Sequence, residues 1–211
     1  MNGRSSKGTV IKCPDTKRRV GAGLILLAAA LFSAAGQAEP VTYTIDPSHT
    51  YPSFEVDHRG GLSVWRGKFN RTSGTVVMDK EAMTGSVDIE IDVTSIDFGY
   101  DDMSEHAMAD DEGMLNVATF PSASYTGQLT NWEDGLPTMV DGELTLHGVS
   151  LPVDLQINQL RCGPARGGGE LCGADAVGSF DRADFGVNYA QGFGFLMYVN
   201  LRIQIEAQSE G

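Results

Sequence analysis

The stretch Val87-Asp88-Ile89-Glu90-Ile91-Asp92-Val93 alternates apolar and polar side chains without a break. Residues 197–207 repeat this alternation, with the apolar side chains at every second position. Successive side chains of a β-strand point to opposite faces, so each stretch predicts a strand with one buried and one solvated face. Many such strands with little helix to cover them close into a barrel or stack as a sandwich.

The same alternation recurs along most of the chain and predicts about nine strands. His147-Gly148 separates two alternating runs by two residues, which is the spacing of a β-hairpin. Residues 101–110 break the pattern, because Met103, His106 and Ala107 are spaced by three and four. We expect one short helix there, capped at its start by Asp101 or Asp102. No internal repeat or strand–helix alternation is found, so residues 39–211 are expected to form one all-β domain.

Residues 1–38 have the features of a secretory signal peptide. Lys17-Arg18-Arg19 precede an apolar run over residues 20–32, and Gly36-Gln37-Ala38 supplies small residues for cleavage. The run is shorter than the roughly 20 residues that a membrane-spanning helix needs. An uncleaved membrane anchor is the alternative interpretation.

The predicted mature chain is strongly acidic. Residues 39–211 contain nine Lys or Arg and 27 Asp or Glu side chains. Such a surface repels phosphate backbones and anionic headgroups, which argues against nucleic acid as a partner and against stable membrane insertion after cleavage. Solubility alone also accounts for this charge. This excess of acidic side chains does not indicate an oligomeric state.

Two cysteines remain after the predicted cleavage, because Cys13 is removed with the leader. Cys162 and Cys172 flank a Gly-rich segment, and an oxidising compartment favours a disulfide between them. A zinc site is a poor alternative, because structural zinc sites use four ligands.

No strong catalytic or metal-binding motif is present, so we predict no catalytic residue and no metal site. The histidines at 49, 58, 106 and 147 are scattered and lack ligand spacing. The acidic residues between 101 and 112 lack the spacing of a calcium loop and are better explained as a solvated face.

Aromatic and aliphatic side chains on the predicted strands and their flanks are candidates for the lining of an apolar tunnel. An eight-stranded barrel has an interior that is either filled by side chains or holds one small ligand, and the pattern alone does not decide between them. The candidate lining residues are Phe54, Val56, Trp65, Phe69, Val76, Ile89, Ile91, Phe120, Tyr125, Leu144, Leu155, Phe185, Phe195 and Val199.

Several motifs, in order and spacing, are similar to those of one known family. They are Tyr43-Thr44-Ile45-Asp46-Pro47-Ser48-His49-Thr50, Phe54-Glu55-Val56-Asp57-His58, Gly67-Lys68-Phe69, Gly74-Thr75-Val76, Val93-Thr94-Ser95-Ile96-Asp97, His106, Phe120-Pro121-Ser122-Ala123-Ser124-Tyr125, Gly142-Glu143-Leu144-Thr145-Leu146-His147-Gly148-Val149 and Asp181-Arg182-Ala183-Asp184-Phe185-Gly186. On these residues the chain resembles the YceI-like family over nearly all of residues 41–207.

The resemblance implies an extended, lipocalin-like antiparallel barrel of about eight strands in the periplasm. It also implies an apolar tunnel that binds a long isoprenoid lipid, such as a polyprenol or a quinone, with no cofactor required. The sequence departs from the family at Ala107, where a Leu is usual, at Asp110-Asp111-Glu112 and at the insertion between Cys162 and Cys172. These departures can reshape the mouth of the tunnel.

Two other functions remain open on the sequence. One is an enzyme that acts on a lipid or quinone inside the barrel through His58, His106 or the acids near Asp181. The other is a filled barrel that serves as a protein interaction module.

Overall fold

The structure, a computed structural model, describes residues 39–210, so the predicted signal peptide over residues 1–38 lies outside the described residues, as does Cys13. The strands are β1 (Val41–Ile45), β2 (Tyr51–His58), β3 (Ser63–Phe69), β4 (Thr72–Asp79), β5 (Thr84–Asp92), β6 (Ile96–Asp97), β7 (Ser122–Glu133), β8 (Leu136–Leu146), β9 (Val149–Pro152), β10 (Leu155–Pro164), β11 (Glu170–Asp181) and β12 (Tyr198–Ser209). The helical elements are η1 (Val93–Ser95), α1 (Asp101–Met108), η2 (Arg182–Phe185) and η3 (Gln191–Phe193).

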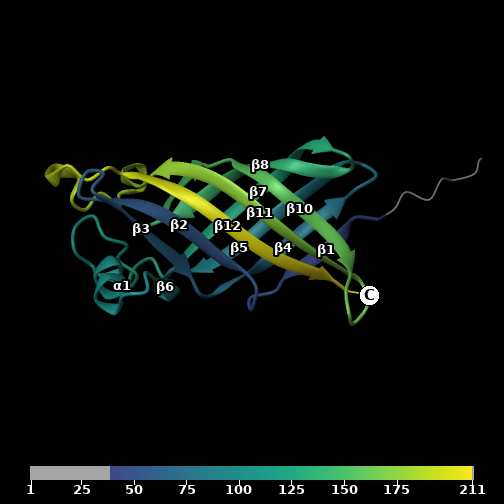
Figure 1. The fold of residues 1–211 in the computed structure, drawn as a ribbon, viewed down its shortest axis with the longest axis horizontal. Helices are drawn as coiled ribbons and strands as arrows, with labels where there is room; N and C mark the ends of the chain where they lie inside the picture. Colours follow the sequence, from purple (N-terminus) through teal and green to yellow (C-terminus); the bar gives the residue numbers. More distant parts are fainter. Residues whose placement is uncertain (1–38, 211) are drawn as a thin grey trace, which may run out of the picture. The chain divides into compact units, whose positions relative to one another are not determined.

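Eight strands close into an antiparallel barrel (Figure 1). β1, β4, β5, β7, β8, β10, β11 and β12 pair in this order, and β1 also pairs with β12, which completes the ring. β2 pairs with β12 beyond β1, β3 pairs with β2, and the short β6 pairs with β3. The predicted all-β fold and the closed barrel of about eight strands are therefore confirmed.

The described part of the chain contains more strands than the nine expected, because several long ribbons are interrupted. β1 and β2 both lie along β12 and are separated at Pro47. Across this break the Thr50 hydroxyl accepts a hydrogen bond from the Glu206 N–H at 3.0 Å and donates to the Glu206 carbonyl at 3.2 Å. The side chain thus replaces ladder bonds that the interrupted backbone cannot make. β9 and β10 both pair with β8 in the same way.

The hairpin at His147-Gly148 is confirmed. Leu146 pairs directly with Val149. His147 and Gly148 have φ angles of 52° and 77°, which are the positive values that a two-residue hairpin requires. A Cβ atom at Gly148 would also collide with the Phe120 ring, so this position needs glycine for two reasons.

The predicted helix is present as α1, but its predicted cap is wrong. Tyr100 occupies the N-cap position and makes no side-chain capping bond, whereas Asp101 and Asp102 lie within the first turn. There the two carboxylates complement the positive end of the helix dipole instead of capping it. Among residues 39–210, no helix combines the length and the apolar character needed to cross a membrane.

The two ends of the barrel differ. Short connections at 80–83, 134–135 and 165–169 lie at one end, where β12 also finishes. The β2–β3 turn, α1 and the segment that carries η2 and η3 lie at the other end (Figure 1). We call this second end the mouth and the first end, with the connections at 80–83, 134–135 and 165–169, the closed end.

Candidate ligand-binding cavity and its mouth

An apolar cavity of about 540 Å³ lies inside the barrel. Such a volume is typical of small-molecule sites. β11 explains why the interior is not filled, because its inward side chains at Cys172, Ala174 and Ala176 are small. The neighbouring β12 contributes the larger Ile203 and Ile205 to the same wall. The small side chains of β11 therefore leave empty space next to the larger apolar side chains of β12.

Most of the residues predicted to line the tunnel do line this cavity, although their role in binding stays a prediction. They are Phe54, Val56, Trp65, Phe69, Val76, Ile89, Ile91, Tyr125, Leu144, Leu155, Phe195 and Val199.

Phe120 and Phe185 do not line the cavity, which corrects the placement expected for them. Phe120 precedes β7 and packs at a tilt against the His147 ring, with 4.3 Å between the ring centroids. Phe185 lies in η2, is almost fully buried, and packs edge-on against Phe180 at 5.1 Å. Both lie outside the strands, where the period of two assigns no face.

The lining residues contributed by the α1 region were not predicted from the sequence. Met103, His106 and Ala107 come from α1, and Met114 and Leu115 come from the connector after it. The helical spacing of the first three was visible in the sequence. Which way that helix would face was not visible.

Charged groups line the cavity only at the mouth. Asp57, His58 and Arg59 lie at the end of β2, His106 lies on α1 and Arg182 begins η2. The rest of the wall is formed mainly by aliphatic and aromatic side chains. Burying an unpaired charge in such surroundings is costly, so the wall favours an apolar occupant.

The buried tyrosine hydroxyls of the wall are satisfied by the protein itself. Tyr125 donates to the Val153 carbonyl at 2.8 Å, and burial raises the pKa of Tyr125. Tyr43 donates to the Glu170 carboxylate. Neither tyrosine hydroxyl needs a ligand to complete its hydrogen bonding. Among residues 39–210, the one buried side-chain oxygen or nitrogen without a hydrogen-bond partner is Thr72 Oγ1, on a residue that lines the cavity.

One buried carboxylate ties two segments of the mouth together. Asp57 accepts hydrogen bonds from the backbone N–H groups of Gly60 and Gly61 in the β2–β3 turn. It also accepts one from the Leu196 N–H at 2.9 Å, in the segment before β12. These hydrogen bonds lower the pKa of Asp57, and the bond from the Leu196 N–H has the largest effect. The Asp57 carboxyl group is therefore ionised at neutral pH.

Replacing Asp57 by Asn is expected to speed ligand exchange about tenfold, because a neutral amide oxygen accepts hydrogen bonds less strongly than a carboxylate. The rate is measured by stopped-flow release of a bound quinone into excess vesicles. Asp79→Asn is the matched control, since Asp79 accepts backbone bonds from Glu81 and Ala82 at the opposite end. Equal release rates from both variants would contradict a role for the Asp57 carboxylate in controlling ligand exchange at the mouth.

Arg182 holds the shape of the segment between η2 and β12. Its guanidinium donates to the Val187 carbonyl at 2.6 Å and to the Tyr189 carbonyl at 3.0 Å. Desolvation by burial lowers the pKa of Arg182. The Asp181 carboxylate accepts from the Ala183 N–H and caps η2. Both side chains therefore hold the backbone around η2 and the segment that follows it.

The α1 region contacts the segment between η2 and β12 across the mouth. The His106 and Tyr189 rings meet edge to face at 5.0 Å. The Tyr189 N–H donates to the Gly113 carbonyl at 3.0 Å. The β2–β3 turn, the α1 region and the segment between η2 and β12 are distant in sequence, yet together they surround one opening.

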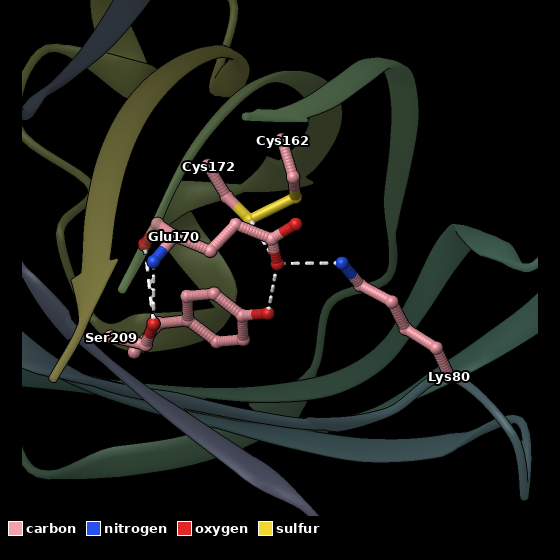
Figure 2. The surroundings of a disulfide bond; sticks show 6 residues. Lys80, Cys162, Glu170, Cys172 and Ser209 are labelled. Atoms are coloured by element: carbon pink, nitrogen blue, oxygen red, sulfur yellow. Dashed lines mark hydrogen bonds and ion pairs between the residues drawn. A yellow bond between two sulfur atoms is a disulfide. The ribbon is translucent and has the colours of Figure 1, made fainter. Parts of the chain in front are cut away.

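The opposite end carries the predicted disulfide between Cys162 and Cys172, which is confirmed (Figure 2). The bond joins directly paired residues of β10 and β11. Glu170 accepts hydrogen bonds there from Tyr43 at 2.5 Å and from Lys80 at 2.6 Å. The insertion therefore lies at the end remote from the mouth, which corrects the expectation that it reshapes the mouth.

Replacing Glu170 by Gln is expected to lower the free energy of unfolding by about 1 kcal/mol at pH 7, as is typical for a partly exposed ion pair. Hydrogen bonds from Lys80 and then Tyr43 lower the pKa of Glu170. Its stabilisation is therefore present above the unfolded pKa of about 4.3 and is lost as the pH falls through the lower folded value.

Urea unfolding at pH 7 and pH 3 measures this difference. The gap between wild type and Glu170→Gln should shrink at the lower pH, whereas Glu133→Gln, an exposed substitution at the same end, should cost little at either pH. A gap that is independent of pH would contradict the assignment.

The histidines do not converge on one another in the described part of the chain. His49 contacts Asp46 at 2.7 Å, and these two lie near Glu206 on the surface. Hydrogen bonds from Ser48 and His49 lower the pKa of Asp46 to about 2, so its carboxylate already has partners. His58 packs between Trp65 and Phe195 at the mouth.

A closed antiparallel barrel with an apolar cavity inside it is the architecture of lipocalin-like barrels. Residues 43–210 match the YceI-like domain, and the chain belongs to that family. It is 32% identical over 162 residues to protein YceI of Escherichia coli O6:H1, an alignment that covers 75% of this chain and 83% of the relative.

Solved structures share the fold. The Burkholderia cenocepacia protein BcnA superposes with a TM-score of 0.61 at 20% identity, covering 77% of this chain and 98% of that one. A polyisoprenoid binding domain from Saccharophagus degradans, implicated in plant cell wall breakdown, superposes with a TM-score of 0.59 at 18% identity. That match covers 81% of this chain and 99% of the domain.

Proposed function

We propose that this protein is a periplasmic binding or carrier protein for a long-chain isoprenoid, a polyprenol or a quinone, and that it has no catalytic activity. The observation that carries the proposal is the cavity inside the barrel, whose wall is apolar away from the mouth. The Saccharophagus degradans structure, described as a polyisoprenoid binding domain, supports the ligand class. The signal-peptide pattern of residues 1–38 supports the compartment.

Burial of hydrocarbon supplies ample driving force for such binding. Each buried CH₂ contributes roughly 0.8 kcal/mol, so one five-carbon isoprene unit contributes about 3 kcal/mol. A few units already match the affinity of specific complexes, even after the cost of ordering the chain. A polar anchor deep in the cavity is therefore not required.

Native mass spectrometry of protein purified from its natural compartment tests the proposal. The expected result is a mass above that of the bare mature chain, which organic extraction removes and added quinone or polyprenol restores. A mass that never exceeds the bare chain, together with no uptake of either lipid, would overturn it. Recovery of the added lipid in chemically altered form would favour an enzyme instead.

A further inference from the structure

The largest exposed apolar side chains of the described residues gather around the mouth. Phe193 is 87% exposed and Leu62 is 74% exposed, each at the tip of a mouth segment. Four further exposed side chains lie on the same two segments and the strands that continue them. We define the mouth platform as Leu62, Val64, Tyr189, Phe193, Leu196 and Tyr198.

The platform is one surface, because its two segments are bound to each other. The Asp57 carboxylate joins the β2–β3 turn to the Leu196 backbone. The backbone of Gly60 lies so close to the Gly194 carbonyl that a Cβ atom at Gly60 would come within 2.9 Å of that oxygen. The rings of His58 and Phe195 meet edge to face beneath it at 5.7 Å. Exposed apolar groups are thus held in a fixed arrangement.

The charge of the platform differs from that of the rest of the chain. Residues 58–78 and 185–205 contain no Asp or Glu, although acids outnumber bases threefold over residues 39–211. Arg66 and Arg202 pair with Glu55, and Arg71 pairs with Asp92. Arg59, exposed at the tip of the β2–β3 turn, forms none of the ion pairs found among residues 39–210.

We propose that the mouth platform docks on the surface of a phospholipid bilayer, with Leu62 and Phe193 inserted among the headgroups and Arg59 beside a phosphate. Large exposed apolar patches mark membrane or protein contacts, and aromatic side chains favour the membrane interface. Arg59 complements a lipid phosphate, because residues 58–78 and 185–205 around it contain no Asp or Glu and the Asp57 carboxylate is buried and bonded to backbone N–H groups. The acidic residues between 101 and 112 belong to the α1 region at the same end and lie outside the platform.

This inference rests on the proposed function, because it supplies the route by which a water-insoluble lipid reaches the cavity. The platform is continuous with the cavity: His58, Arg59 and Phe195 border both, and Tyr189 belongs to both. A lipid that leaves the bilayer at the platform enters the barrel with little of its chain exposed to water.

Flotation with phosphatidylcholine vesicles tests the docking, using the mature protein and the double variant Leu62→Ser/Phe193→Ser. Removing two large inserted side chains is expected to weaken vesicle binding at least tenfold and to slow transfer of a fluorescent polyprenol from vesicles to the protein. The matched control is Val41→Ser/Met83→Ser, which removes two exposed apolar side chains at the closed end and is expected to behave as wild type.

A second measurement separates this inference from the proposed function. Loading of the same polyprenol from detergent solution bypasses the bilayer and should be equal in wild type and both double variants. Wild-type protein that does not bind vesicles, or a platform variant that binds and transfers as the control does, would overturn the docking. Vesicle binding without uptake of lipid from any source would instead overturn the proposed function and leave the docking surface standing.

Discussion

Replacing Ala176 by Trp is expected to weaken isoprenoid binding about 100-fold or more. Ala176 faces the cavity from the middle of β11, between Ile157 of β10 and Ile203 of β12. An indole ring there occupies space that the proposed ligand needs. Excluding one isoprene unit forfeits about 3 kcal/mol of burial, which is roughly two powers of ten in affinity.

Titration of the delipidated protein with a quinone measures this loss. Ser179→Trp is the matched control, because Ser179 is exposed on the outer face of the same strand. It should leave affinity unchanged. Thermal unfolding must show that Ala176→Trp remains folded, which is expected because the ring enters empty space rather than a packed core. Unchanged affinity in the folded Ala176→Trp variant would show that the ligand does not occupy this part of the barrel.

The strands were predictable from sequence because burial on one face of a sheet imposes a period of two. Residues 87–93 show this most clearly: Val87, Ile89 and Ile91 line the cavity from β5. The same rule gave the hairpin register at Leu146 and Val149. It failed for Phe120 and Phe185, whose positions are set by contacts outside the strands.

The hollow interior was not predictable from the hydrophobic pattern, because a filled barrel shows the same alternation. A weak signal existed in side-chain size. Ala174 and Ala176 occupy successive inward positions of β11, and Cys172 precedes them. Small residues in register leave a hollow only if the facing walls do not fill it. That outcome depends on the curvature and closure of the whole barrel.

The mouth was the least predictable region, because long-range contacts determine it. Asp57 meets the Leu196 N–H, which lies 139 residues further along the chain. Tyr189 meets His106 and Gly113 across the opening. Loop residues have no periodicity that fixes the direction of their side chains. The resemblance to the family therefore identified the motif around Arg182, but it did not show that Arg182 holds the segment between η2 and β12.

Removing the disulfide by Cys162→Ser/Cys172→Ser is expected to lower the free energy of unfolding by about 2–3 kcal/mol. The bond closes a short loop between paired strands and so restricts the unfolded chain. With a urea m-value of about 2 kcal/mol/M, the unfolding midpoint should fall by roughly 1 M. The loss should concentrate at the closed end, where Glu170 and Ser209 link β11 to β12.

Urea unfolding with and without reductant, together with hydrogen exchange, checks this result. Reductant should move wild type toward the variant and leave the variant unchanged. Amides near residues 160–174 should exchange faster in the variant, whereas those of the mouth, held by Asp57 and Arg182, should keep their protection. An unaltered midpoint would mean that the paired strands and the Glu170 contacts already hold the closed end without the covalent bond.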